Sequence, residues 1–330
     1  MTPSNSNSHW LDRPVFVTGC TGILGSWLTI ALVNRGATVT GLIRDQVPFS
    51  QLRASGYQQR IRVVPGDVTD YALVERALNE YEIDTVFHLA AQTIVPIANR
   101  APLSTFETNI RGTWTVLEAA RRSPGVRSIL VASSDKAYGA AEELPYTEDT
   151  PLLGLYPYDV SKACADRITQ TYAATYHLPV AVTRCANLYG GGDLNWSRLI
   201  PGTIRSVIRG QQPVIRSDGT LRRDYLYVQD AVAAYLKLAG AMEEAPHVRG
   251  QSFNIGVDDP RTVMEVVEAI IDVSDQPALE PTILARAPNE IQDQYLDSGK
   301  ARRLLGWAPR YSLKEGLRET MAWYRDFLTR

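Results

Sequence analysis

The sequence predicts an α/β protein with a doubly wound parallel sheet of the Rossmann type, followed by a smaller C-terminal α/β lobe. Two observations lead to this prediction. Short apolar runs alternate with helical patterns through the first half of the chain, and a glycine-rich turn follows the first run. Continuous Val, Ile and Leu runs are typical of strands buried on both faces, as in a parallel sheet covered by helices. The length of 330 residues allows a large domain and a second lobe.

The expected elements follow in order. Strands are predicted at residues 15–18, 38–43, 61–64, 85–89, 128–132 and 180–183. Helices are predicted between them at residues 23–35, 71–81, 103–122 and 157–176. Beyond residue 190 the pattern is mixed, with helices near 199–209, 263–273, 300–305 and 313–328 and short strands near Val214, Tyr225 and Phe253. We therefore expect a disordered tail (1–10), a dinucleotide-binding domain (11–189) and a mainly substrate-binding lobe (190–330) whose chain can cross back to the sheet.

Composition argues against several classes of function. The chain has 34 basic and 36 acidic residues and a formal charge of -2, which gives no basic footprint for nucleic acid. No run approaches the roughly 18 apolar residues of a membrane helix, and the start lacks the regions of a signal peptide. A soluble, cytoplasmic protein is expected. Cys20, Cys164 and Cys185 are scattered and the four histidines show no ligand spacing, so neither a disulfide framework nor a metal site is predicted.

The glycine-rich turn predicts a dinucleotide site. Gly19 permits the tight turn after the first strand, Gly22 lets the backbone approach a pyrophosphate, and Gly25 allows close packing of the helix. The N-terminus of that helix then faces the phosphates. The same loop contributes Thr21, Ile23 and Leu24.

The ends of the next strands are expected to hold the rest of the cofactor. The second strand ends at Arg44 and Asp45, where the adenosine ribose should lie. An acidic residue there favours NAD, whereas Arg44 can pair with a 2′-phosphate and favours NADP, so both cofactors stay open. Asp67 and Val68 are placed to cover the adenine. The fourth strand ends in residues that let the cofactor lie close, namely Leu89, Ala90 and Ala91.

Acid/base residues gather after the fifth strand and at the start of the next helix. Tyr158 and Lys162 are four residues apart and share one helix face, so the ammonium is expected to stabilise the phenolate and lower the Tyr158 pKa. Such a phenolate can remove a hydroxyl proton while hydride leaves the same carbon. Asp135 and Lys136 form a second acid/base pair that simple alcohol oxidation does not need.

Together these motifs resemble the extended short-chain dehydrogenase/reductase superfamily that acts on nucleotide sugars, from about residue 15 to 324. The matching segments are residues 18–25, 66–68, 88–92, 158–162, 187–190, 223–225 and 305–307. Within that superfamily, Asp135 followed by Lys136 resembles the CDP-glucose 4,6-dehydratases, whereas 4-epimerases carry small hydroxyl or apolar residues there. Segment 217–225 resembles the general epimerase/dehydratase pattern instead of the Arg-Pro-Trp segment of CDP-glucose enzymes, which leaves the nucleotide base open.

The resemblance implies a reaction. Tyr158 takes the 4-OH proton with Ser134 orienting that hydroxyl, Lys136 removes the C5 proton, Asp135 protonates the departing C6 hydroxyl, and hydride returns to C6. A 4-epimerase and a non-catalytic NAD(P)-binding protein are the alternatives. The residues expected to bind the nucleotide-diphosphate sugar are Gln92, Ser134, Asn187, Arg198, Arg216, Arg223 and Glu290, with Asp293 and Tyr295 near the ribose. A homodimer is expected through apolar faces on helices 103–122 and 157–176, with Leu103, Phe106, Ile110, Leu117, Ile168 and Tyr172.

Overall fold

A computed structural model describes residues 8–141, 143–286 and 291–329. Its centre is a seven-stranded sheet with the order β11-β6-β5-β4-β1-β2-β3, in which every neighbouring pair is parallel. The strands are β1 (Pro14–Thr18), β2 (Thr38–Ile43), β3 (Arg62–Pro65), β4 (Thr85–His88), β5 (Ser128–Ala132), β6 (Val180–Cys185) and β11 (Ser252–Ile255). The doubly wound fold is thereby confirmed. The strand order reverses beside β1, which is where such sheets bind ligands.

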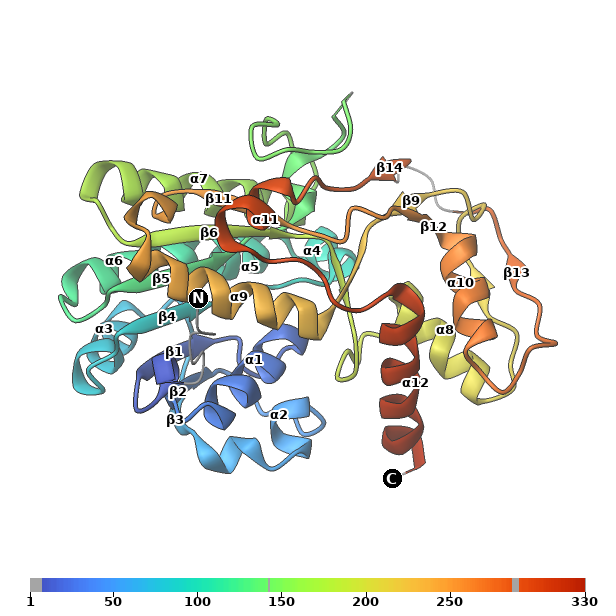
Figure 1. The fold of residues 1–330 in the computed structure, drawn as a ribbon, viewed down its shortest axis with the longest axis horizontal. Helices are drawn as coiled ribbons and strands as arrows, with labels where there is room; N and C mark the ends of the chain where they lie inside the picture. The colour runs from blue at the N-terminus through green and yellow to red at the C-terminus, as the bar shows by residue number, and fades with distance from the viewer. Residues whose placement is uncertain (1–7, 142, 287–290, 330) are drawn as a thin grey trace.

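Helices cover both faces of this sheet (Figure 1). On one face α1 (Ile23–Asn34) packs against α9 (Val228–Glu244), and on the other α6 (Gly112–Arg122) packs against both α3 (Tyr71–Glu80) and α7 (Pro157–Tyr176). Successive strand residues therefore enter different cores. Val15 and Val17 belong to the cluster under α1, whereas Phe16 belongs to the cluster under α6. Leu117 is fully buried in that second cluster, so its assignment to a dimer face is wrong.

A second lobe lies beside the sheet, on the right of Figure 1. Its helices α8 (Leu199–Ile208), α10 (Val263–Asp272) and α12 (Leu313–Thr329) pack on one another. Short strands complete it: β8 (Val214–Ile215), β9 (Arg222–Arg223), β12 (Arg261–Thr262), β13 (Thr282–Ile283) and β14 (Asp293–Gln294). The pair β7 (Asn187–Tyr189) and β10 (Tyr225–Tyr227) lies where the chain passes between the sheet and this lobe.

The second half of the chain returns to the sheet. Helix α9 contacts β5 and α1, β11 forms an edge strand beside β6, and α11 (Gly299–Leu305) packs on β11. Helix α9 has no counterpart among the predicted elements, and its buried residues lie on more than one side of the helix. The boundary at residue 190 stays a prediction.

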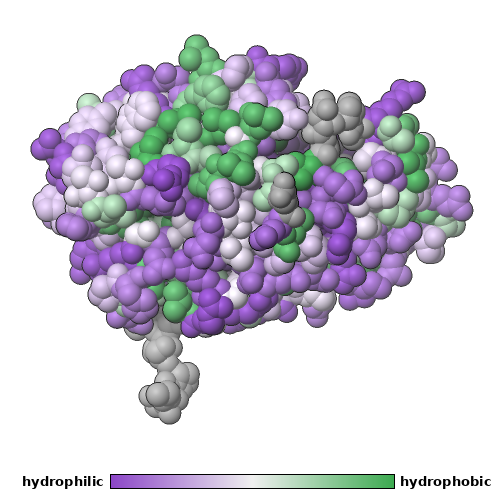
Figure 2. Space-filling model, turned by 90° about the horizontal axis from the view of Figure 1, so that it is seen from above, coloured by the Kyte–Doolittle hydropathy of each residue, from purple (hydrophilic) through white to green (hydrophobic). Residues whose placement is uncertain are grey.

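Two smaller features differ from the expectations. Residues 8–10 form a short 3-10 helix whose Trp10 is only 3% exposed, so ordered chain begins before residue 11. The helix expected at 103–122 is divided into α5 (Pro102–Phe106), a π-helical turn (Glu107–Arg111) and α6. The loop before α7 exposes Leu153 and Leu155, and Figure 2 shows apolar side chains gathered on the face seen from above. Within the described ranges, no helix is both long and apolar enough to cross a membrane.

Candidate functional site

The turn between β1 and α1 has the shape that a dinucleotide requires. Gly19 has a φ of +70°, and a β-carbon there would lie 2.7 Å from the amide nitrogen of Ala90. A β-carbon on Gly25 would overlap the carbonyl oxygen of Gly19. Gly22 is the N-cap of α1 and makes no side-chain cap, so the first amides of the helix remain available for a phosphate. Of the predicted loop residues, Thr21 lies in this turn, and Ile23 and Leu24 are the first residues of α1.

The end of β4 is braced against this turn. The backbone amides of Leu89 and Ala90 both donate to the Thr18 hydroxyl at 3.1 Å, which places the 89–91 segment beside the glycine loop. His88 bonds to Thr18 at 2.9 Å and to Thr113 at 3.1 Å. Burial, assisted by the Lys162 charge, lowers the pKa of His88 to about 3. The imidazole is therefore neutral and acts as a brace between strand and helix.

At the end of the site predicted to bind adenosine, the side chain of Arg44 lies between two carboxylates. Arg44 donates to Asp45 at 2.7 Å, and its guanidinium lies 3.7 Å from the Asp67 carboxylate. The other oxygen of Asp67 accepts from the backbone and the hydroxyl of Thr69. Val68 is buried against Gly112 of α6, where a β-carbon would lie 2.6 Å from a Val68 methyl group.

The predicted acid/base residues meet at the carboxyl end of β5. A 3-10 helix, η4 (Asp135–Tyr138), follows the strand, and the Ser134 hydroxyl accepts from the Lys136 amide at 3.3 Å and donates to Asp135 at 3.0 Å. Tyr158 and Lys162 on α7 are 8% and 5% exposed. The pKa of Tyr158 is raised mainly by burial, lowered by a hydrogen bond with Ser134 and raised by the Asp135 charge, so these groups share one enclosure.

The expected effect of Lys162 on Tyr158 is wrong for this structure. Burial raises the pKa of Tyr158 above its usual value of 10. The Lys162 ammonium donates to the carbonyl of Ala132 at 2.8 Å, and burial lowers its own pKa to about 8. Because Lys162 points to the end of β5 and is itself poorly solvated, its charge does not outweigh the desolvation of the phenol.

Asp135 and Lys136 form an enclosed pair. Asp135 is 2% exposed, and burial raises its pKa against the opposing effects of the Lys136 charge, the Ser134 hydrogen bond and the Arg223 charge. Asp159 on α7 also faces this pair: burial raises its pKa to about 6, Lys136 lowers it and Asp135 raises it. Lys136 donates to Gln294 of β14 at 3.1 Å.

Several of the predicted sugar-nucleotide residues bind to other parts of the protein. The Gln92 side-chain oxygen accepts from the Ile94 amide at 3.0 Å, and the Asn187 amide donates to the Asp224 carbonyl at 3.4 Å. Arg198, the N-cap of α8, donates to Asp193 at 2.8 Å. Its charge also lowers the pKa of Tyr158, so it lies close to the phenol.

Arg223 is buried and fastens the second lobe. Its guanidinium donates to the carbonyls of Ile291 at 2.6 Å and Gln292 at 2.9 Å, which holds β9 beside β14. Arg216 is exposed on the segment after β8. Glu290 lies outside the described residues. The proposed contacts of these residues with a sugar nucleotide stay predictions.

Two polar residues near the site were not predicted. Asn109, in the π-helical turn, accepts from the Gln92 amide at 2.7 Å and donates to the Gln92 carbonyl and to Ser161 of α7. π-turns inside helices are frequent at functional sites, but a sequence pattern does not reveal them. Gln294 is fully buried beside Lys136. In the described part of the chain, no group of three or more His, Cys, Asp or Glu side chains is placed to hold a metal.

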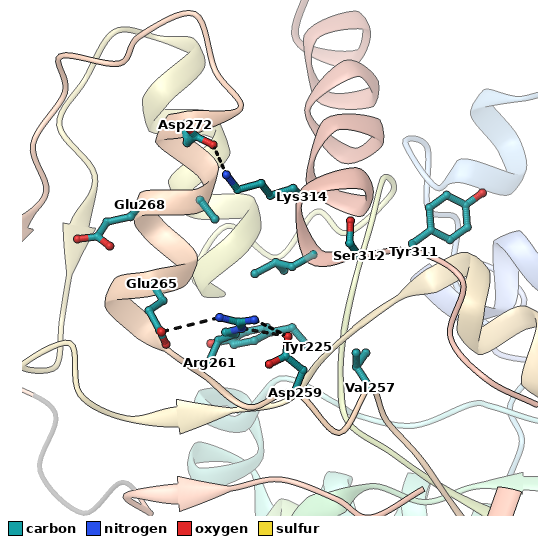
Figure 3. Close-up of a pocket in the computed structure, with 12 residues that line it drawn as sticks. Tyr225, Val257, Asp259, Arg261, Glu265, Glu268, Asp272, Tyr311, Ser312 and Lys314 are labelled. Atoms are coloured by element: carbon teal, nitrogen blue, oxygen red, sulfur yellow. Dashed lines mark hydrogen bonds and ion pairs between the residues drawn. The ribbon is translucent and has the colours of Figure 1, made fainter. Parts of the chain in front are cut away.

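A separate cavity of about 520 Å³ lies in the second lobe (Figure 3). Lys314 of α12 reaches across to Asp272 of α10, and Arg261 pairs with Asp259 at its base. Its lining residues are Tyr225, Val257, Asp259, Arg261, Glu265, Glu268, Ala269, Asp272, Tyr311, Ser312, Leu313 and Lys314. None of these belongs to the acid/base set or to the glycine loop.

The fold and the site together define an extended short-chain dehydrogenase/reductase, and comparison with known proteins narrows the class. The pattern of the GDP-mannose 4,6 dehydratase family matches residues 16–320. The chain belongs to this family. It is 30% identical to the CDP-glucose 4,6-dehydratase of Salmonella typhimurium, over 97% of this chain and 93% of that protein.

Solved structures agree on the fold. The UDP-glucose 4-epimerase of Thermotoga maritima, solved with UDP-glucose, superposes with a TM-score of 0.87 at 28% identity, covering 96% of this chain and all of that one. The dTDP-glucose 4,6-dehydratase of Bacillus anthracis, solved with NAD, superposes with a TM-score of 0.81 at 27% identity, covering 95% of this chain and 97% of that one. Dehydratases and epimerases therefore share this scaffold, and the acid/base residues must distinguish them.

Proposed function

We propose that the protein is an NAD-dependent nucleotide-sugar 4,6-dehydratase whose substrate is CDP-glucose. The observation that carries this proposal is the enclosed Asp135–Lys136 pair beside Tyr158. An epimerase needs the tyrosine but has no use for a second acid/base pair. The similarity to the Salmonella CDP-glucose enzyme supports both the reaction and the base.

In the proposed mechanism, Tyr158, Lys136 and Asp135 each carry out a different proton transfer. Tyr158 accepts the proton of the sugar 4-OH as a phenolate, so the reaction requires ionisation of a phenol whose pKa burial raises. Ser134 orients the hydroxyl. The ketone formed at C4 acidifies the C5 proton, and the side-chain nitrogen of Lys136 accepts it. Asp135 donates its proton to the C6 hydroxyl, so the C6–O bond breaks, a C5–C6 double bond forms and water leaves. Burial raises the pKa of Asp135 and so favours the protonated acid that this step requires.

After water has left, protonation of C5 by Lys136 accompanies the return of hydride to C6 and removes the C5–C6 double bond. The proton taken up by Tyr158 replaces the one that Asp135 gave. The chemistry supplied by bound NAD is hydride transfer, from C4 at the start and to C6 at the end. The glycine loop and the N-terminus of α1 would hold its pyrophosphate, and the 89–91 segment would lie beneath it. The net change in the sugar is the loss of one water.

Arg44 supports NAD over NADP. The Asp45 and Asp67 carboxylates both lie within 4 Å of its guanidinium. A 2′-phosphate approaching Arg44 would meet two like charges, whereas a ribose hydroxyl can donate to either carboxylate.

A cytoplasmic homodimer through α6 and α7 is part of this proposal. Leu103 of α5 is 74% exposed and Trp114 of α6 is 44% exposed. Ile110, Ile168 and Phe106 are half-buried on the same helices. Large apolar side chains exposed on adjacent helices support an interface there.

The test is an incubation of the purified protein with NAD and, in turn, CDP-, UDP-, GDP- and dTDP-glucose, with NADP as the alternative cofactor. We expect mass spectrometry to show a product lighter by one water, formed fastest from CDP-glucose with NAD. An isomer of unchanged mass would instead establish a 4-epimerase. Binding of NAD without turnover of any sugar nucleotide would establish a non-catalytic binding protein.

A further inference from the structure

We propose that Gln294 is a positioning residue that holds Lys136 for proton abstraction and also contributes a donor to the hexose. Gln294 lies in β14, directly opposite Arg223 of β9, and is fully buried. Its side-chain oxygen accepts from the Lys136 ammonium at 3.1 Å. The inference rests on the proposed function for its chemistry, but the contact itself can be tested separately.

The hydrogen bond with Lys136 defines the orientation of the amide. The Lys136 nitrogen donates to the Gln294 oxygen, so the Nε2 group points elsewhere. Within the described ranges, Nε2 of Gln294 has no hydrogen-bond partner, and neither do Oδ2 of Asp135 and Oδ1 of Asp293. A buried polar atom without a partner costs about 1–3 kcal/mol.

These atoms match a sugar hydroxyl. Nε2 of Gln294 is a donor without a partner, and Oδ2 of Asp135 also has no partner; Gln294 bonds to Lys136, whose charge acts on Asp135. A hydroxyl group both donates and accepts, so one hydroxyl of the hexose can bond to both. We assign Nε2 of Gln294 to such a contact, which would place the sugar between η4 and β14.

The segment around Gln294 is held firmly enough for a positioning role. The Tyr146 amide donates to the Tyr295 carbonyl at 3.0 Å, and the Asp297 amide donates to the Tyr146 carbonyl at 2.8 Å. Arg223 binds the carbonyls just before β14. Because the strand is fixed on both sides, the distance from Gln294 to Lys136 is set by the fold. The other charged groups that face Lys136 are Asp135 and Asp159.

Two variants separate the roles of the two amide atoms. Gln294→Leu removes both atoms at similar size, and we expect kcat for water loss to fall about 10- to 100-fold, because misplacement of a reacting group by about 1 Å costs about that much. Its KM is expected to rise as well. Gln294→Glu keeps an acceptor for Lys136 but lacks the donor and adds a charge that favours the ammonium. We therefore expect it to recover kcat relative to Gln294→Leu only as pH is raised, while KM stays raised at every pH. A purely structural role would not produce this split.

Gln292→Leu is the matched control. Gln292 lies two residues away on the same segment, is exposed and directs its side chain to Thr220. We expect kcat and KM of this variant to equal those of the wild type. Thermal melting of all three variants is measured to show that they fold.

Labelling of Lys136 tests the contact without turnover. The proteins are treated with limiting acetic anhydride, and acetylation of Lys136 relative to Lys237 is measured by peptide mass spectrometry. We expect relative labelling to rise several-fold in Gln294→Leu and to stay at or below the wild-type level in Gln294→Glu. Unchanged labelling in both variants would overturn the proposal. If the wild type forms no dehydrated sugar, the proposed function fails, and labelling still decides whether Gln294 holds Lys136.

Discussion

Burial controls the charge of the reacting side chains. It raises the pKa values of Tyr158 and Asp135 and lowers that of Lys162 to about 8. In each case the uncharged form gains, because each group is removed from water without a fully compensating partner. In the proposed reaction, cleavage of the C6–O bond requires a protonated Asp135. Burial raises the Asp135 pKa and so favours that form.

The first prediction concerns Lys136. Lys136→Met keeps the length of the side chain and removes the amine, while Ser134 and Tyr158 remain in place. We expect the rate of water loss to fall at least about 100-fold, since a placed acid or base is worth about 10²- to 10⁴-fold. Loss of deuterium from substrate labelled at C5 should fall by the same factor. Mass spectrometry of the sugar product measures both.

The control for this variant is Lys314→Met. Lys314 pairs with Asp272 on the surface of the second lobe and is 57% exposed. Equal deuterium loss in wild type and Lys136→Met would show that another residue removes the C5 proton.

Individual site residues differ in how well sequence reveals them. Ser134, Asp135, Lys136, Tyr158 and Lys162 lie in two short segments whose residue types match a known chemistry, and the structure brings these segments together. Gln294 and Asn109 lie in segments that meet the site only after folding. A buried amide has no spacing or periodicity that marks it, so only the three-dimensional contacts identify these two residues.

At the scale of elements, a buried ion pair joins the helix and the turn that carry the acid/base residues. Arg184 of β6 donates to Asp166 of α7 at 2.7 Å and to the Tyr138 hydroxyl of η4 at 2.9 Å. Tyr138 in turn donates to Asn254 of β11 at 2.6 Å. Removing one partner from a buried network of this kind strongly destabilises the fold. The network therefore fixes the position of α7 relative to η4. Arg184 lies one residue beyond the strand predicted at 180–183, and nothing in the sequence indicates that Asp166 is its partner.

The second prediction concerns a carboxyl that links β10 to the loop after β11. Asp224 is fully buried and accepts from the amides of Val257 and Asp258, yet burial raises its pKa to about 7. A raised pKa in the folded state means that folding favours the protonated form. Its contribution to stability is complete below the unfolded pKa near 3.8 and is lost as pH rises through about 7.

We therefore expect the free energy of unfolding to decline between about pH 4 and 7 as Asp224 ionises in the unfolded chain. The slope is at most about 1.4 kcal/mol per pH unit, and the melting temperature falls with it. Asp224→Asn cannot ionise and should flatten this part of the profile, although its overall stability is lower because the amide group faces backbone donors. Calorimetry across this range compares the two slopes. Parallel profiles for wild type and variant would show that Asp224 does not titrate in this range.

At the scale of the whole molecule, local sequence patterns predict the strands of the central sheet better than the path of the C-terminal half of the chain. The strands at 38–43 and 128–132 and the helix at 157–176 have the predicted bounds, because a buried parallel strand and a long amphipathic helix each show their own periodicity. The return of α9 and β11 to the sheet depends on contacts between distant segments. Periodicity contains no such information, so the sequence predicts that the chain can cross back to the sheet but not which elements do so.

The last prediction concerns assembly. If α6 and α7 of two chains pack together, Trp114 moves from 44% exposure into an apolar interface. Large aromatic side chains at the centre of an interface contribute about 2 kcal/mol or more, and a carboxylate in that place would remain unpaired. We expect the wild type to sediment with twice its chain mass of 36.6 kDa and Trp114→Glu to sediment as a monomer at micromolar concentration.

Val214→Glu provides the control for this change. Val214 is 52% exposed on β8 of the second lobe, away from α6 and α7, so the same apolar-to-acidic substitution should leave the dimer intact. Far-UV circular dichroism of both variants shows whether the fold is kept. A wild-type protein that sediments as a monomer would refute the dimer. A Trp114→Glu protein that remains dimeric would place the interface on another surface, because an unpaired carboxylate in a tightly packed helix interface costs several kcal/mol.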